Sequence, residues 1–380
     1  MKQKEIYFDN NATTKPLPEV CEEVLKVMGP EFGNPSSAHS TGARARKHIS
    51  QAREQLAQLI GSDSSKITFT GSGTEANNMA FYSCTRDQTN GCEILTTTVE
   101  HSSIQKMSNF LKLNGVSVRK LQVNLQGLIN LEELKESINE NTSLVSIQLV
   151  NNETGVIQPI SEIGEICREL GVPLHTDAAQ AVGKLEMNIQ EMPIDFLSLT
   201  GHKFHSPQGV GAIYCKDKFL LAPMLFGGFQ EEGFRPGTEN VPGIAGMGKA
   251  AEIRKNNLSE LISTMKDLRD RFEAMLLDFI AGTKVNGDTN NRICNTSNIL
   301  FSGIDARRLV KELDQNGVRC SQSSACTNFE IAPSYVLLAM GLTEEQAYSS
   351  IRFSFSVENT YDEIDSVIEI IRKLTDKLKN

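Results

Sequence analysis

The chain has 380 residues, of which 39% are hydrophobic and 22% are charged, and this composition excludes a disordered or low-complexity protein. Because one hydrophobic core seldom serves 380 residues, we expect two lobes. The net charge of −9 disfavours direct binding to nucleic acid. No apolar run approaches the roughly 18 residues of a membrane span, and the N-terminus lacks the apolar core of a signal peptide, so we expect a cytoplasmic protein.

The first part of the chain alternates strand and helix patterns. A helix pattern that ends at Gly61 comes first, and two further helix patterns lie between short runs of β-branched and apolar residues. This alternation predicts an α/β lobe with a mostly parallel sheet. The predicted helices are residues 44–60, 131–138 and 160–170, and the predicted strands are residues 67–70, 94–97, 117–123, 144–150, 172–175, 196–199 and 211–214.

After about residue 248 the pattern changes to that of a smaller α+β lobe. A long helix pattern is followed by strand-like segments and by a last amphipathic helix. No Pro/Ser linker separates the two lobes, so we expect them to pack tightly. The segments are residues 258–279, 297–301, 318–326, 351–355 and 364–378.

The eight cysteines are scattered along the chain, without a C-x-x-C pair or a histidine spacing typical of zinc. We therefore expect free thiols in a reducing compartment and no metal site. Cys326 differs from the others because small polar residues surround it, which suits an exposed, reactive thiol. An inert thiol is the alternative.

The glycine-rich run from Gly71 to Thr74 follows a predicted strand and precedes a helix pattern. Glycines let the backbone approach an anion and a helix N-terminus adds N–H donors, so this run predicts a phosphate-binding loop. Gly71, Gly73 and Ala76 also match the G-x-G-x-x-A dinucleotide pattern. Nicotinamide binding and an ordinary turn therefore stay open as alternatives.

Asp177 and Lys203 each come at the end of a predicted strand. An aspartate there can reach a ligand ring, or it can cap the next helix. A lysine there can form a Schiff base, although most lysines are surface residues. With the phosphate-binding loop, the pair supplies what a pyridoxal phosphate site needs: Asp177 would keep the pyridine nitrogen protonated and Lys203 would hold the aldehyde.

Two further polar residues and one polar run fit such a site. His101 could stack on the ring and move protons, or be a structural hydrogen-bonding residue. The run from Asn151 to Gly155 could present an amide to the ring hydroxyl or to the substrate, or form an ordinary turn. Arg352, in a strand-like run, could bind a substrate carboxylate or form a structural ion pair.

Taken together, these motifs resemble the cysteine desulfurases of the NifS/IscS type, which are fold type I pyridoxal phosphate enzymes of the class V aminotransferase group. The resemblance implies a large domain at residues 15–255 with a mostly parallel seven-stranded sheet, and a small α+β domain made of residues 1–14 and 256–380. It covers nearly the whole chain and rests on residues 7–14, 32–37, 73–75, 100–101, 150–153, 176–180, 201–203, 235–240, 324–326 and 351–354.

Position by position, the resemblance implies three catalytic residues: Lys203 would hold the cofactor, His101 would stack on its ring, and Cys326 would be the nucleophile. Asn152, near the cofactor, and Arg352 would bind the substrate carboxylate. The other residues implied to bind the cofactor are Gly73, Thr74, Asp177, Gln180, Thr200, His202 and, from the other subunit of a homodimer, Thr238.

The implied activity is conversion of L-cysteine to L-alanine, with a persulfide on Cys326 that is delivered to a sulfur-acceptor protein, as in iron–sulfur cluster assembly. A selenocysteine lyase-like activity and a non-catalytic sulfur-relay scaffold are the alternatives. Cys320 is an unexplained second thiol. The positions that depart from the usual family pattern are Asn11, Ser206, Gln208, Glu232 and Ser323.

Overall fold

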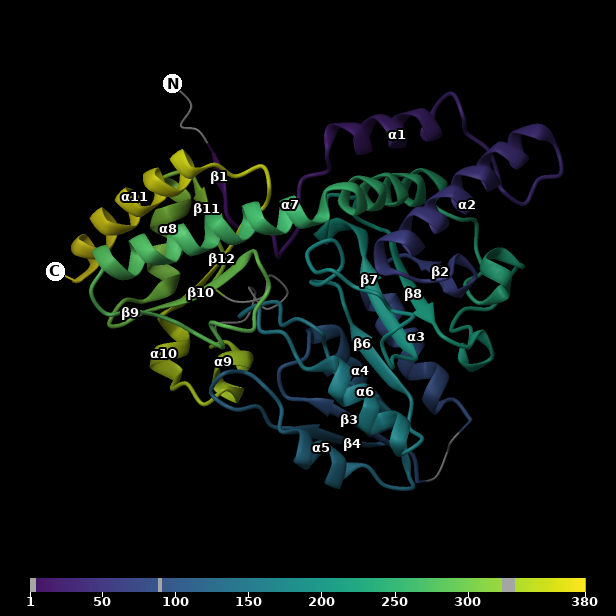
Figure 1. Cartoon of the computed structure of the whole chain (residues 1–380), viewed down its shortest axis with the longest axis horizontal. Coiled ribbons are helices and arrows are strands. Elements are labelled where there is room, and N and C mark those ends of the chain that lie inside the picture. Colours follow the sequence, from purple (N-terminus) through teal and green to yellow (C-terminus); the bar gives the residue numbers. More distant parts are fainter. Residues whose placement is uncertain (1–4, 88–90, 323–331, 380) are drawn as a thin grey trace.

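The computed structural model describes residues 5–87, 91–322 and 332–379, and its largest element is a seven-stranded sheet (Figure 1). The strands run in the order β2-β8-β7-β6-β5-β3-β4, and only β8 is antiparallel to its neighbours. The predicted α/β fold with a mostly parallel sheet is confirmed. The strands are β2 (Ile67–Thr70), β3 (Glu93–Thr97), β4 (Ser117–Leu121), β5 (Thr142–Ser146), β6 (Leu174–Asp177), β7 (Phe196–Thr200) and β8 (Gly211–Cys215).

Only β2 keeps its predicted range, and the differences are largest for β5 and β6. β5 ends at Ser146 instead of residue 150, and β6 begins after Pro173 instead of at residue 172. Pro173 has no N–H to donate to the ladder, which explains the later start. The chain beyond Ser146 still follows β6, since Leu149 N donates to Asp177 O at 3.0 Å. The polar residues that follow both strands therefore lie at one edge of the sheet.

Both faces of the sheet are buried. Successive side chains of a strand point to opposite faces, and along β8 they enter two different apolar clusters: Ala212 and Tyr214 on one face, Ile213 and Cys215 on the other. This explains why the strands consist of continuous apolar runs instead of alternating patterns.

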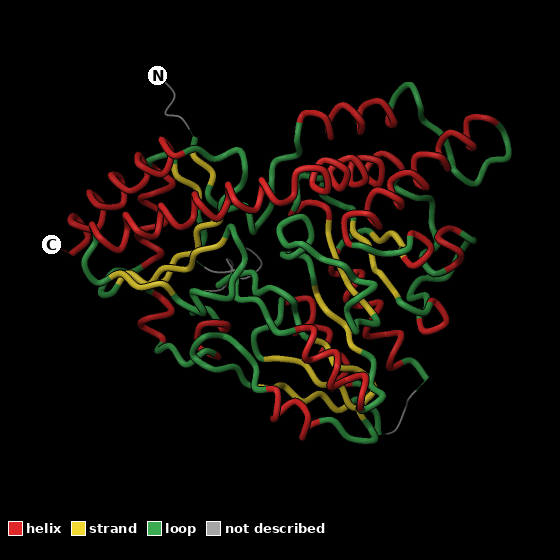
Figure 2. Tube along the Cα trace, in the orientation of Figure 1, coloured by secondary structure: helices red, strands yellow, loops and turns green. Residues whose placement is uncertain are grey.

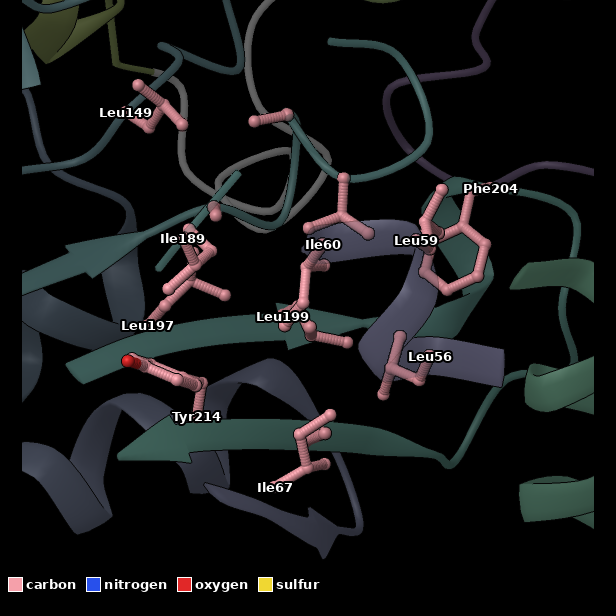
Figure 3. Close-up of a cluster of buried hydrophobic side chains, with 14 of the residues drawn as sticks. Leu56, Leu59, Ile60, Ile67, Leu149, Ile189, Leu197, Leu199, Phe204 and Tyr214 are labelled. Atoms are coloured by element: carbon pink, nitrogen blue, oxygen red, sulfur yellow. The ribbon is translucent and has the colours of Figure 1, made fainter. Parts of the chain in front are cut away.

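Helices cover the two faces. Figure 3 shows Leu56 and Leu59 of α2 over Leu199 of β7, on one face. Residues of α3 and α4 belong to the cluster on the other face. The predicted helices correspond to α2, α5 and α6. The helices of this part of the chain are α1 (Pro18–Met28), α2 (Ser40–Ile60), α3 (Gly73–Thr85), α4 (Ser102–Leu113), α5 (Leu131–Ser137) and α6 (Ile160–Glu169).

The second lobe contains a three-stranded antiparallel sheet in the order β12-β10-β9 and a parallel pair, β1 and β11. The N-terminal segment belongs to its core, because the Phe8 ring lies 4.9 Å from the Phe355 ring. Its elements are β1 (Ile6–Tyr7), β9 (Thr283–Val285), β10 (Thr296–Phe301), α8 (Ala306–Gln315), β11 (Val318–Arg319), α9 (Tyr335–Ala339), α10 (Glu344–Tyr348), β12 (Ser350–Ser354) and α11 (Tyr361–Lys379).

The long helix α7 (Val241–Phe279) joins the two lobes (Figure 1). It begins earlier than the pattern at 258–279 predicted, with Asn240 as its cap and Pro242 in its first turn. The proposed domain boundary at residues 255 and 256 falls inside this helix. The larger apolar cluster reaches along α7 to Met265, and the cluster of the second lobe begins at Leu268.

Among the described residues, no helix has the length and apolar character to cross a membrane. No cluster of His, Cys, Asp or Glu side chains in the same part of the chain has the arrangement of a metal site.

Candidate active site

A cavity of about 360 Å³ lies where the carboxyl ends of the parallel strands meet residues of the second lobe. Loops and turns occupy this part of the molecule (Figure 2). Open α/β sheets bind ligands at this edge. The predicted site residues that line the cavity are Gly73, Thr74, His101, Asn152, Asp177, Gln180, Thr200, His202, Lys203 and Arg352.

The glycine-rich loop after β2 leads into the N-terminus of α3. Ser72 caps the helix, because its Oγ accepts a hydrogen bond from Glu75 N at 3.1 Å. Gly73 and Thr74 begin the helix, so their N–H groups have no acceptor within it and are available at the cavity. A Cβ on Gly211 would lie 2.6 Å from Ser72 C, so β8 approaches the loop closely only because residue 211 is glycine. This loop is suited to bind an anion.

Lys203 lies in a 3-10 turn directly after β7. Its Nζ donates to the carbonyl oxygens of Asn11 at 2.5 Å and Ala12 at 2.7 Å, so the N-terminal segment forms part of the wall around this amine. Burial and the charge of Lys203 lower the pKa of His202 to about 4, so this imidazole is neutral at pH 7. Its Nδ1 lies 3.1 Å from Thr13 Oγ1.

Asp177 is the buried last residue of β6. Its Oδ1 accepts a hydrogen bond from Ala179 N at 2.9 Å, but a turn follows β6, so Asp177 does not cap a helix as the alternative reading proposed. Its Oδ2 accepts from Asn77 Nδ2 at 2.7 Å. The carboxylate is therefore held from two sides while it faces the cavity. Sequence reasoning missed Asn77, because nothing in the sequence distinguishes it from the neighbouring Asn78.

His101 is the cap residue of α4. Its Nδ1 accepts a hydrogen bond from Ser103 N at 3.2 Å and lies 2.8 Å from Ser103 Oγ. Because a backbone N–H can only donate, Nδ1 carries no proton, and the proton of a neutral His101 is on Nε2. The preceding residue, Glu100, is fully buried, and burial raises the pKa of its carboxyl to about 8.

Both polar atoms of the Gln180 side-chain amide are held by hydrogen bonds. Its Nε2 donates to Asn11 O at 3.0 Å, and its Oε1 accepts from Lys184 Nζ at 2.7 Å. Lys184 is 3% exposed, and burial lowers its pKa to about 7. Sequence reasoning missed Lys184 and the carbonyl of Asn11, although the four-residue spacing of Gln180 and Lys184 could have indicated a contact on one helical turn.

Arg352 and Asn152 meet at the end of the cavity that belongs to the second lobe. Arg352 is 1% exposed, and its Nη2 lies 2.6 Å from Asp9 Oδ1, which is the structural ion pair that the sequence left open. Its Nη1 donates to Asn152 O at 3.0 Å. Arg352 Nε and Asn152 Oδ1 are buried and find no hydrogen-bond partner in the described part of the chain. Both residues line the cavity.

Among the described site residues that the sequence predicted, Thr238 does not line the cavity. Thr238 is exposed, in the segment before α7. Cys326 and Ser323 lie outside the described residues. The flanking residues that are described contact the cavity region: Ser321 pairs with Arg352 through backbone hydrogen bonds, and Tyr335 donates its hydroxyl to Glu100 O at 2.6 Å.

The described part of the chain contains seven cysteines, all of them free thiols. Burial raises the pKa of Cys294 to about 11, and it also raises the pKa of Cys320. The thiols whose pKa burial raises to about 12 are Cys84, Cys167 and Cys215. A thiol in such surroundings stays protonated at pH 7 and is a poor nucleophile.

The model of the family described as "Aminotransferase class-V" matches residues 6–367. The chain belongs to this family. A curated cysteine desulfurase of Trichormus azollae is 44% identical over 98% of this chain and 94% of its own length. The solved structure of a NifS-like protein has a TM-score of 0.93 at 33% identity and covers 98% of this chain and 100% of its own. A structure titled "SspA in complex with cysteine" has a TM-score of 0.83 at 33% identity, over 92% of this chain and 99% of its own.

These comparisons confirm the resemblance drawn from the sequence and the fold, and the chain is an enzyme of this family, not a nicotinamide oxidoreductase. Pyridoxal phosphate is the cofactor of the family, and the cavity fits it. An anion-binding loop, the Lys203 amine and the Asp177 carboxylate surround one space. Asn152 Oδ1 and Arg352 Nε add two buried polar atoms whose partners a ligand would supply.

Proposed function

We propose that the chain is a pyridoxal phosphate-dependent cysteine desulfurase. It converts L-cysteine to L-alanine and leaves the sulfur as a persulfide on Cys326, for delivery to an acceptor protein. The observation that carries the proposal is the single cavity that Lys203, Asp177 and the Gly73–Thr74 helix start line together. The name of the 44% identical relative supports the same activity.

Each cavity residue has a place in holding the cofactor. Lys203 Nζ would bond its aldehyde carbon, Asp177 would accept from its pyridine N–H, and His101 would stack on its ring. Gln180 Nε2 and the Asn152 amide would lie near the ring hydroxyl. The groups that would hold the phosphate are the Gly73 and Thr74 N–H groups and the Thr200 and His202 side chains, with Thr238 of a second copy completing the site in a homodimer.

The bound cofactor supplies an electron sink that makes the substrate Cα–H acidic. The Lys203 amine would accept this proton and return it later. Arg352 and Asn152 bind the substrate carboxylate, and the unpartnered Arg352 Nε offers a donor for it that the Asp9 ion pair does not use.

Sulfur transfer belongs to Cys326. Its thiolate attacks the substrate sulfur, and a new S–S bond forms as the Cβ–S bond of the substrate breaks. The electron pair of that bond stays with the carbon fragment, which takes up a proton at Cβ and leaves as alanine. The sum is L-cysteine and a thiol giving L-alanine and a persulfide.

The test uses the purified full-length protein with pyridoxal phosphate. We expect a yellow chromophore that borohydride fixes to Lys203 in a peptide map, and sulfide and alanine in equal amounts from L-cysteine with dithiothreitol as reductant. Cys326→Ala keeps the colour and loses sulfide release, whereas Lys203→Ala loses both. Normal sulfide release by Cys326→Ala would mean that the nucleophile is another residue.

Two further arms separate the alternatives. Selenide release from L-selenocysteine without sulfide release from L-cysteine would assign a selenocysteine lyase. A protein that binds pyridoxal phosphate but releases neither product would be a relay scaffold.

The proposal includes a cytoplasmic location, supported by the free thiols of the seven described cysteines.

A further inference from the structure

A chain of hydrogen bonds links Asp177 to His101 through two residues that have no part in the proposed function so far. Asn77 Nδ2 lies 2.7 Å from Asp177 Oδ2 and 2.9 Å from Ser103 Oγ. Ser103 Oγ in turn lies 2.8 Å from His101 Nδ1. Asn77 is 2% exposed and Ser103 is 8% exposed, so water has little access to these contacts, which strengthens them.

The donors and acceptors available fix the direction of every bond in this chain. An ionised Asp177 can only accept, so Asn77 turns its NH₂ group toward it, and the second hydrogen of that group goes to Ser103 Oγ. The Ser103 hydroxyl proton is then directed to His101 Nδ1, which also accepts from Ser103 N at 3.2 Å. The reversed Asn77 amide would place its oxygen against the carboxylate and break the chain.

We propose that Asn77 is a positioning residue that couples the ionised carboxylate of Asp177 to the Nε2–H tautomer of His101 through Ser103. The Asn77 side chain thereby acts on two groups of the site. It holds the carboxylate that would face the pyridine nitrogen, and through Ser103 it favours one tautomer of the imidazole that would face the ring. This inference rests on the proposed function for the identity of the ring, but the coupling itself concerns only residues of this chain.

The helix α3 offers a matched control. Asn78 is the next residue, of the same type and half-buried, and its side chain has no hydrogen bond to other described residues. Asn77→Ala removes the bonds to Asp177 and Ser103, and Ser103→Ala removes the bonds of Ser103 Oγ to Asn77 and His101. Asn78→Ala removes none of these bonds.

The first measurement is the affinity of the full-length protein for pyridoxal phosphate. Asn77→Ala should weaken binding about tenfold, the loss typical of one hydrogen bond to a charged group. Ser103→Ala and Asn78→Ala should bind within about twofold of the wild type, because the bond between Asn77 and Asp177 remains. Equal affinities of Asn77→Ala and Asn78→Ala would overturn the role of Asn77 toward Asp177.

The second measurement is the nitrogen NMR spectrum of full-length protein whose histidines carry nitrogen isotope label. The His101 ring signals are assigned because they are missing from the spectrum of His101→Gln. We expect a neutral wild-type His101 protonated at Nε2. In Asn77→Ala and Ser103→Ala the Ser103 N–H still donates to Nδ1, so Nε2–H stays the major tautomer while the fraction protonated at Nδ1 rises. A wild-type His101 protonated at Nδ1, or variants with the wild-type spectrum, would overturn the coupling.

Recording the NMR spectra with and without pyridoxal phosphate separates the two proposals. A protein that never binds the cofactor contradicts the proposed function, while its His101 spectrum still decides whether the chain of hydrogen bonds exists. If Asn77→Ala does not fold, Ser103→Ala alone decides the link to His101, because it leaves the contact of Asn77 with Asp177 in place.

Discussion

Lys184 shows how burial sets the charge of a single residue in this molecule. Its pKa is lowered to about 7, chiefly by burial and further by the charge of Lys203. The pKa of a lysine in an unfolded chain is about 10.4. Between these two values the unfolded chain binds a proton that the folded protein does not, so the contribution of Lys184 to stability rises with pH by about 1.4 kcal/mol per unit.

Lys184→Met should remove this pH dependence. Between pH 7 and 10 the wild type should gain stability relative to the variant by about 1.4 kcal/mol per pH unit. Chemical unfolding of both proteins without cofactor at pH 7, 8 and 9 measures the difference. Lys255→Met, at an exposed lysine of α7, serves as the control. A constant difference between wild type and Lys184→Met at all three pH values would contradict a buried, neutralised lysine.

The residues found from the sequence share a local signal, and the missed ones do not. Asp177 and Lys203 directly follow apolar strand patterns, so their place at the edge of the sheet could be predicted from spacing alone. Asn77 lies within α3, Lys184 lies in the turn after β6, and Asn11 acts through its backbone carbonyl. Their roles depend on which segments approach one another, and one-dimensional patterns do not contain that information.

At the scale of one strand, His175 ties β6 to both of its neighbours. Its Nδ1 lies 2.8 Å from Ser146 Oγ of β5, and its Nε2 lies 2.9 Å from Ser198 Oγ of β7. Burial lowers the pKa of His175 to about 4. Because an unfolded histidine titrates near about 6.5, the unfolded chain gains a proton first as the pH falls, and stability drops between pH 6.5 and 4.

His175→Gln should make the protein less sensitive to acid. The wild type should lose about 1.4 kcal/mol more stability per pH unit than the variant between pH 6.5 and 4. Urea unfolding at pH 6.5 and 5 measures this loss, and His39→Asn, at an exposed histidine, serves as the control. Parallel stability curves for His175→Gln and wild type would show that His175 takes up its proton equally in both states.

The contact between β8 and the glycine-rich loop gives a prediction for a pair of glycines. Gly211→Ala would place a Cβ 2.6 Å from Ser72 C, so we expect about 1–3 kcal/mol of destabilisation from overpacking. Gly73→Ala meets its nearest atom, Thr200 Cβ, only at 3.4 Å, so its stability should stay within about 0.5 kcal/mol of the wild type. Thermal unfolding compares the two, and equal losses would argue against the close approach.

At the scale of the whole molecule, α7 is the element that both apolar clusters share. Met265 belongs to one cluster and Leu268 to the other, so a change between them acts on both. The sequence predicted two lobes and a long helix, but the helix period alone could not say that one helix serves both cores. Whether α7 contributes to both clusters depends on which of its side chains pack against each lobe, and only the folded structure shows that packing.

Lys266→Pro should uncouple the two lobes. Proline in a helix interior costs about 3 kcal/mol or more and interrupts α7 between the clusters. Calorimetry should show one transition for the wild type and two for the variant. Lys266→Ala, at the same exposed position, should keep the single transition. A single transition in the proline variant would mean that the lobes are held together mainly by contacts outside α7.

The N-terminal segment beside Lys203 is held in place by a residue that is synthesised much later. Asn11 accepts the Lys203 amine through its carbonyl, and its own N–H donates to Ser354 Oγ, 343 residues later in the chain. Ser354 therefore leaves the ribosome after both Asn11 and Lys203. The Asn11 N–H can bond Ser354 only after β12 has been made, so the contacts that hold the Asn11 carbonyl beside Lys203 cannot all form before that point in synthesis.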